Sequence, residues 1–228
     1  MNDAVVVPGG RDVRGSLDGP PAPGGSGGEA VESWVVACPP PPRMGGSRSD
    51  PRLGAVSDSL TERGIACLRF DYGPWDGGAG ECLDALNALG WADERYDRVG
   101  AFGYSFGAAA ALVAAARVAG GTAGGRVASV PDAVAAVSAL APPARLTGDV
   151  DAVAATDALD PPVQVCYGER DDTVEWEPVV ERARERGFQV EAFAADHHFV
   201  GQHGAVGDRV GAFFGPALGG RDGDETGR

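Results

Sequence analysis

Lysine is absent from this sequence of 228 residues, and its 19 basic residues are all arginine. The 33 acidic residues outnumber them, so the formal net charge is −14 and the sequence pI is about 4.5. Such a charge disfavours nucleic acids and anionic membranes as partners, because they carry the same sign. It is typical of proteins from a salt-rich cytoplasm, although an ordinary acidic protein from a GC-rich genome would also favour Ala, Gly and Arg over Lys.

Long apolar runs are also missing. No stretch approaches the ~20 continuous apolar residues of a membrane span, and the N-terminus, Met1 to Val5, lacks the basic region of a secretory signal. We therefore expect a cytoplasmic protein. The four cysteines show no C-x-x-C spacing, and three of them lie in or at the ends of predicted strands, so buried reduced thiols are expected rather than disulfides or metal ligands.

Short apolar strands alternate with amphipathic helices along the chain. A hairpin is predicted at 4–7 and 13–17, and further strands at 31–38, 65–71, from 98, 133–140, 163–167 and 189–193. Helices are predicted at 50–63, 81–91, 106–118, 175–186 and 206–214. This alternation predicts an α/β fold, a mostly parallel twisted sheet with helices on both faces and an antiparallel N-terminal hairpin.

The length suits a single domain, which we place at 1–218. Residues 219–228 are too polar to pack and are expected to form a flexible acidic tail. Only 22 residues, 141–162, separate two of the predicted strands, so no substantial cap domain is expected.

The stretch from Arg98 carries the most specific signal. An apolar strand is followed by Gly103-Tyr104-Ser105-Phe106-Gly107 and then by an Ala-rich helix. This G-x-S-x-G pattern between a strand and a helix is typical of a nucleophile elbow, which holds a serine hydroxyl clear of the sheet. Small residues are needed two places before and after the serine, because the strand and helix backbones approach closely there. The helix also directs free N–H groups toward a forming oxyanion.

A serine nucleophile needs a base, and the base needs an acid to orient it. The only histidines, His197, His198 and His203, follow the last predicted strand, and Asp171 and Asp172 follow the strand before it. The order Ser, Asp, His is expected for this architecture. Each group comes just after the carboxyl end of a strand, where open α/β sheets place their sites.

These motifs resemble the α/β-hydrolase superfamily over residues 4–214, and within it small, lidless dienelactone-hydrolase-like esterases. Those esterases commonly read H-P-H-P-x-x-G-G after the third strand, R-F-(D/N)-Φ-R-G at the end of the fourth (Φ is hydrophobic), and A-D-H-F-F in the last loop. The corresponding segments here are Pro39–Gly46, Arg69–Gly73 and Ala195–Phe199.

The resemblance implies roles for individual residues. His197 is the implied base, because it follows Ala-Asp directly and His198 takes the place of an aromatic residue. Asp171 is the implied acid at G-x-x-D, with Asp172 as the alternative, although Asp172 could equally cap the following helix. His203 is expected to be a solvated side chain.

The oxyanion loop departs from the family pattern. Pro39–Pro42 replace both histidines, and proline has no N–H to donate. One oxyanion donor is then the N–H of Phe106, and the second is expected from Arg43 or Met44, after an extended proline run. The arginine of the fourth-strand motif is also absent, because Gly73-Pro74-Trp75 stands in its place.

The sequence therefore predicts a serine hydrolase that cleaves a small ester, thioester or lactone through an acyl-enzyme, with Ser105, His197 and Asp171 as the triad. No metal and no organic cofactor are implied, and the partner is a small-molecule substrate. The alternative is a non-catalytic binding module of the same fold with a degraded oxyanion loop. Peptidase activity would use the same triad, but nothing in the sequence marks an amide-selective pocket.

The net charge generates a prediction about salt. Screening of like charges should stabilise the folded state, and a gain of ~2 kcal/mol would raise the thermal midpoint by roughly 4–8 °C for a chain of this size. Calorimetry from low salt to molar KCl measures this rise. A midpoint that does not change with KCl would reject halophilic adaptation and leave genome composition as the reason for the missing lysine.

Overall fold

The fold is an eight-stranded mixed sheet in the order β1-β2-β4-β3-β5-β6-β9-β10. The computed structural model describes residues 2–19, 32–121, 127–147 and 150–219. The strands of the sheet are β1 (Asn2–Val7), β2 (Val13–Asp18), β3 (Ser33–Cys38), β4 (Ala66–Asp71), β5 (Arg98–Tyr104), β6 (Ala136–Leu140), β9 (Val163–Gly168) and β10 (Gln189–Phe193). The hairpin β1–β2 joins β4 in antiparallel fashion, and the pairs from β4 through β10 are parallel.

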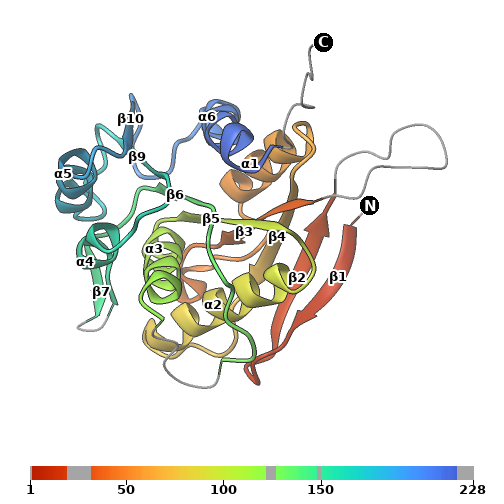
Figure 1. Cartoon of the computed structure of the whole chain (residues 1–228). Coiled ribbons are helices and arrows are strands. Elements are labelled where there is room, and N and C mark those ends of the chain that lie inside the picture. The colour runs from red at the N-terminus through yellow and green to blue at the C-terminus, as the bar shows by residue number, and fades with distance from the viewer. Residues whose placement is uncertain (1, 20–31, 122–126, 148–149, 220–228) are drawn as a thin grey trace, which may run out of the picture.

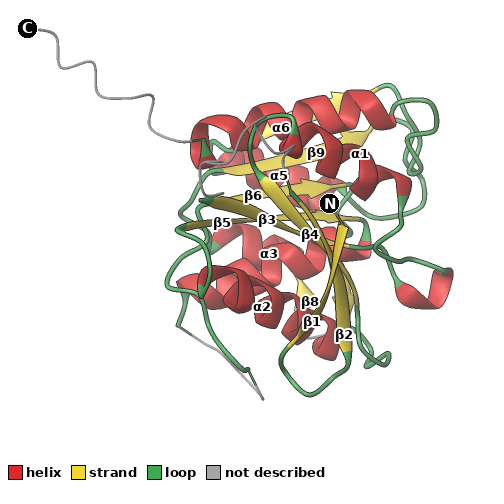
Figure 2. Cartoon of the chain, turned by 90° about the vertical axis from the view of Figure 1, so that its right-hand side faces the viewer, coloured by secondary structure: helices red, strands yellow, loops and turns green. Residues whose placement is uncertain are grey.

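Helices cover both faces of this sheet (Figures 1 and 2). One face carries α1 (Pro51–Thr61) and α6 (His203–Leu218), which lie side by side; the other carries α2 (Ala79–Asp93) and α3 (Phe106–Ala119). On that second side, nearer the β10 edge, are α4 (Ala152–Asp157) and α5 (Glu177–Glu185). In the described ranges no helix has both the length and the apolar character to cross a membrane.

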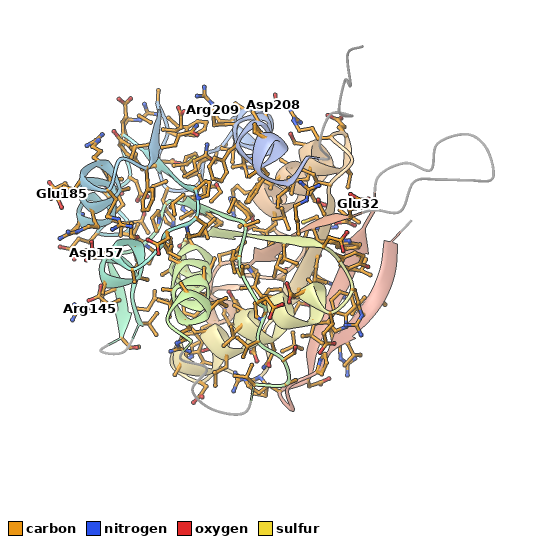
Figure 3. The ribbon with its side chains drawn as sticks, viewed as in Figure 1. Glu32, Arg145, Asp157, Glu185, Asp208 and Arg209 are labelled. Carbon is orange, nitrogen blue, oxygen red and sulfur yellow. The ribbon has the colours of Figure 1, made fainter. Side chains whose placement is uncertain are left out.

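Two hydrophobic cores result, one on each face. All six residues of β3 are buried, which a strand covered by helices on both faces requires. Helix α3 presents a run of buried alanines, so it packs close to the sheet with little side-chain bulk between them. Charged side chains such as Arg145, Asp157 and Glu185 lie at the periphery (Figure 3).

The predicted architecture is confirmed, including the antiparallel hairpin and the helices on both faces. The connection 141–162 holds more structure than the sequence indicated: its described residues form a small second sheet, β7 (Arg145–Thr147) with β8 (Val150–Asp151), followed by α4. These strands are too short for a period-two pattern to reveal them. Among the described residues of this connection, no cap domain is evident. The predicted tail lies outside the described residues from 220 onward, so the domain boundary at 218 stays a proposal.

The closing helix is longer than predicted. It begins at His203 and passes through Pro216, whereas 206–214 was expected. Helix α5 begins at Glu177 with Trp176 at its N-cap position, so Asp172 does not cap it.

A buried ion network joins the N-terminal hairpin to α2 and to the loop before it. Arg11, in the turn between β1 and β2, donates from Nε to Asp84 Oδ1 at 2.8 Å and from Nη2 to the Pro74 carbonyl at 2.6 Å; the same nitrogen lies 3.6 Å from Glu81. Both carboxylate side chains are fully buried. Burial raises the pKa of Asp84, and the bonds from Arg11 and from the Gly73 N–H oppose this shift. Arg11 therefore offsets a desolvation penalty.

Close packing shows how completely Arg11 fills this space. A Cβ atom added to Gly73 would lie 2.0 Å from the Arg11 carbonyl oxygen, and one added to Gly80 would lie 2.4 Å from Arg11 Cζ. Gly73 is the position where the resembling esterases carry arginine. The Arg11 guanidinium reaches the loop that follows Gly73 from the hairpin, through its bond to the Pro74 carbonyl.

Removal of Arg11 should destabilise the fold. Arg11→Ala leaves two buried carboxylates without their cation and should lower the free energy of unfolding by about 3 kcal/mol. Arg14→Ala is the matched control, because Arg14 pairs with Asp12 only 3.1 Å away but both side chains are about two-thirds exposed; its removal should leave the free energy of unfolding nearly unchanged, because solvent screens an exposed pair. Urea denaturation measures both, and equal small losses would contradict the importance of the buried network.

Candidate active site

Ser105 occupies a strained backbone position between β5 and α3. Its φ is 54° and its ψ is −120°, a conformation that residues other than glycine rarely adopt. The Ser105 N–H donates to the Leu140 carbonyl at 2.8 Å, which ties the turn to the end of β6. The strain and the strand–turn–helix context are those of a nucleophile elbow.

The two glycines of the motif permit very close backbone contacts. A Cβ on Gly103 would lie 2.1 Å from the Gly107 carbonyl oxygen, and a Cβ on Gly107 would lie 2.1 Å from the Cys38 carbonyl oxygen. No side chain fits at these distances. The first turn of α3 therefore packs directly on the carboxyl end of β3, where the proline loop begins.

His197 lies between Ser105 and Asp171. Its Nε2 is 2.9 Å from Ser105 Oγ, and its Nδ1 is 2.7 Å from Asp171 Oδ2. All three residues are buried, with exposed fractions of 7% for Ser105, 5% for His197 and 8% for Asp171. The structure thus brings together three residues from distant parts of the chain in a continuous hydrogen-bonded series.

Backbone amides and an indole hold the Asp171 carboxylate and its loop. Asp171 Oδ1 accepts from the Thr173 N–H at 3.0 Å and from the Val174 N–H at 3.4 Å, which leaves Oδ2 for His197. Trp176 Nε1 donates to the Asp171 carbonyl at 3.0 Å. Asp172 is exposed.

The two other histidines lie outside this series. The His198 side chain is exposed, and its ring stands edge-on to that of His197 with centroids 5.6 Å apart. His203 is the first residue of α6, and its Nε2 is 3.3 Å from the His198 carbonyl oxygen. It has a local contact that the sequence did not indicate.

The proline loop forms a short 3₁₀ helix, Pro42–Met44, labelled η1. Pro41 is extended, but Pro42 opens the helix, so the expected extended run ends one residue early; the fixed φ of proline suits a first helical position. The Met44 N–H, one of the two amides expected to supply the second oxyanion donor, donates to the Pro41 carbonyl at 3.0 Å. Within the described part of the chain, neither the Arg43 N–H nor the Phe106 N–H donates a hydrogen bond.

An aromatic group borders the elbow, and the sequence did not predict it. The ring of Phe106 packs against Tyr72 (5.7 Å between centroids) and Trp75 (5.6 Å), and the Arg43 guanidinium lies 5.4 Å from the centre of the Trp75 ring. Trp75 is 38% exposed and Met44 83% exposed. The only available signal was the departure Gly73-Pro74-Trp75 from the family motif.

The cysteines have no part in this site's hydrogen-bonded series. All four are buried and unbridged. Burial raises the pKa of Cys67 and of Cys82 to about 12, so both stay thiols at neutral pH. Among the described residues, no three His, Cys, Asp or Glu side chains converge in a way that could hold a metal ion.

Comparisons with known proteins identify the fold. No family model matches the sequence, and no curated protein is detectably similar to it. Among solved structures, an α/β serine hydrolase without a lid from Xanthomonas campestris is 21% identical with a TM-score of 0.72, each chain covered over 96% of its length. A dienelactone hydrolase from Anabaena variabilis is 24% identical with a TM-score of 0.68, over 96% of this chain and 98% of that one.

A third solved structure, esterase 2 of Thermogutta terrifontis phosphoramylated by tabun, is 17% identical with a TM-score of 0.75, over 96% of this chain and 97% of that one. At such identities the likeness concerns architecture. The chain has the α/β-hydrolase fold, as the sequence motifs predicted.

The close contacts at the elbow generate a prediction about glycine. Gly107→Ala places a Cβ against the backbone of β3 and should either prevent folding or lower stability by more than about 3 kcal/mol. Gly54→Ala, in α1, is the control, because a Cβ there meets nothing within 4 Å and should be neutral or stabilise by up to ~1 kcal/mol. Thermal midpoints of the two purified variants test this. A Gly107→Ala protein as stable as its parent would contradict the packing described.

Proposed function

We propose that this chain is a serine hydrolase that cleaves a small ester, thioester or lactone through an acyl-enzyme. The observation that carries the proposal is the series Ser105 Oγ, His197 Nε2, His197 Nδ1 and Asp171 Oδ2, with links of 2.9 and 2.7 Å. It is supported by the strained φ of 54° at Ser105, since such strain persists where function requires it.

Acylation begins with His197 in the tautomer that carries its proton on Nδ1, donated to Asp171. Ser105 Oγ attacks the substrate carbonyl carbon while its proton passes to His197 Nε2, and the carbonyl electron pair moves onto oxygen. Asp171 stabilises the resulting imidazolium without taking its proton. Collapse of the tetrahedral intermediate breaks the bond to the leaving alcohol, thiol or ring oxygen, which takes the proton from Nε2.

Deacylation repeats the steps with water. His197 Nε2 takes a proton from water as its oxygen attacks the acyl carbon, and the proton then returns to Ser105 Oγ when the ester bond breaks. The products are a carboxylic acid and the free serine. These steps require no metal and no organic cofactor.

The oxyanion needs donors where its charge develops. The Phe106 N–H, immediately after the nucleophile, is one proposed donor. Of the two residues expected to supply the second, the Met44 amide is bonded to Pro41, and the Arg43 amide remains as the proposed donor. Loss of one such donor typically lowers turnover by roughly 10²–10³-fold.

The surroundings of the site support a small substrate. The connection 141–162 contributes only β7, β8 and α4 among its described residues, so no domain covers the elbow. Trp75 exposes apolar surface beside Phe106. An open, partly aromatic surface suits small or surface-exposed esters better than buried lipids.

The alternative is a non-catalytic binding module, and one observation favours it. Pro39–Pro42 have no N–H, and the Met44 amide is already bonded, so only one of the expected loop donors is left. Labelling with a fluorophosphonate separates the two functions, because it requires a serine activated by its base. A binding module would not be labelled.

The triad prediction is tested with short p-nitrophenyl esters in molar KCl. Ser105→Ala and His197→Ala should each lower kcat by roughly 10⁴-fold or more, because they remove the nucleophile and the base. Asp171→Asn should lower it by roughly 10⁴-fold, since it favours the wrong tautomer of His197.

Three neighbouring side chains provide the matched controls. Asp172→Asn, His198→Ala and His203→Ala should each leave kcat within about threefold of the parent, because none of these side chains belongs to the hydrogen-bonded series. If Asp172→Asn or His198→Ala were inactive while Asp171→Asn or His197→Ala stayed active, the assignment within that pair would be wrong. An unlabelled parent with no esterase activity would favour the binding module.

A further inference from the structure

His197 lies in a turn between β10 and α6, outside any helix or strand. Local bonds shape this turn: the His198 N–H donates to Asp196 Oδ1 at 2.9 Å, and the Gln202 N–H donates to the Phe199 carbonyl at 2.9 Å. Phe199 has a φ of 51°, which is strained for a buried aromatic residue. The carbonyl oxygens of His197 and His198 accept hydrogen bonds from side chains of other elements.

Tyr104 supplies the first donor. Its phenol donates to the His197 carbonyl oxygen at 3.0 Å, a buried bond between residues 93 positions apart. The Tyr104 ring also packs beside the His197 ring, with centroids 5.5 Å apart. Tyr104 is the last residue of β5 and the immediate neighbour of Ser105, so one residue connects the backbone of the nucleophile to that of the base.

Arg52 supplies the second donor. Its Nη1 donates to the His198 carbonyl oxygen at 3.1 Å. Asp50, the N-cap residue of α1, holds this guanidinium: Asp50 Oδ1 accepts from Arg52 Nε at 2.9 Å, and Oδ2 forms a further bond with Nη2. The guanidinium lies over the Tyr104 ring, 4.4 Å from its centre, so the two donors support each other.

We propose that Tyr104 and Arg52 are positioning residues for the base, which fix the main chain at His197 and His198 and thereby hold the imidazole between Ser105 and Asp171. This inference rests on the proposed hydrolase function. Neither side chain belongs to the hydrogen-bonded series; each acts through His197.

The Tyr104 phenol stays protonated and therefore remains a hydrogen-bond donor to the His197 carbonyl. Burial raises the pKa of Tyr104 to about 12, so its O–H remains a donor throughout the range in which His197 would work as a base. The imidazole must hold both its 2.9 Å and its 2.7 Å contacts. A displacement of 1 Å at a reacting group can lower the rate by about 10²-fold.

Tyr104→Phe tests the proposal, because it keeps the ring and its contacts and removes only the donor. We expect kcat for p-nitrophenyl esters and the rate of fluorophosphonate labelling to fall about tenfold, the equivalent of one hydrogen bond, with KM within about twofold. The thermal midpoint should fall by no more than about 2–4 °C. A merely structural tyrosine would lower the midpoint and leave kcat unchanged.

Tyr96→Phe is the matched control. Tyr96 stacks on Trp34 with ring centroids 4.1 Å apart, near the opposite end of β5. Its variant should keep the parent's kcat and labelling rate. A Tyr104→Phe variant with the parent's kcat, or a Tyr96→Phe variant that loses as much, would overturn the proposal.

Proton NMR separates this proposal from the proposed function. The His197 Nδ1–H bonded to Asp171 should give a far-downfield resonance, assigned by its loss in His197→Ala. In Tyr104→Phe it should shift or broaden, and an unchanged resonance would overturn the positioning role even if the parent proved inactive.

Arg52→Lys is a second variant. One ammonium cannot replace both the ion pair with Asp50 and the hydrogen bond to the His198 carbonyl, so the same resonance should move and kcat should fall about threefold.

Discussion

The structure depends on one steric constraint, the direct contact of three backbone segments at the elbow. The end of β5, the first turn of α3 and the end of β3 approach so closely that Gly103 and Gly107 admit no Cβ. This contact forces Ser105 into its strained conformation and places the N-terminus of α3 under its hydroxyl. It also brings the proline loop, which leaves β3 at this point, beside Phe106. The proposed nucleophile, the helix end and the oxyanion loop are therefore consequences of a single packing event.

The remaining parts of the site come from loops that are fixed by side-chain bonds to main chain. Amides of Thr173 and Val174 hold the carboxylate of Asp171, and Trp176 holds its carbonyl. Tyr104 holds the turn that carries His197. Loops lack the regular backbone hydrogen bonds that fix the geometry of a helix or strand. Bonds from side chains to the main chain therefore supply the necessary precision here.

The features that could be predicted from the sequence are those that local sequence patterns determine. The elbow, the mostly parallel sheet implied by alternating strands and helices, and the Ser, Asp, His order each follow from short-range signals, and Asp171 was preferred over Asp172 mainly through the resemblance. Long-range contacts were not predictable: nothing in the sequence near Arg11 indicates that it reaches Asp84, 73 residues away. The second oxyanion donor was expected from Arg43 or Met44 after an extended proline run, whereas Pro42 begins a 3₁₀ helix and the Met44 N–H bonds to Pro41. The fixed φ of proline suits both an extended and a helical backbone, so the sequence did not distinguish them.

The network at Arg11 has a consequence for how the molecule opens. An edge hairpin with one neighbouring strand would ordinarily fray on its own and exchange its amide hydrogens quickly. Here, lifting β1 and β2 away would withdraw the cation from two buried carboxylates. The hairpin and α2 should therefore open as one cooperative unit, which would make residues 2–18 part of the slow-exchanging body of the protein.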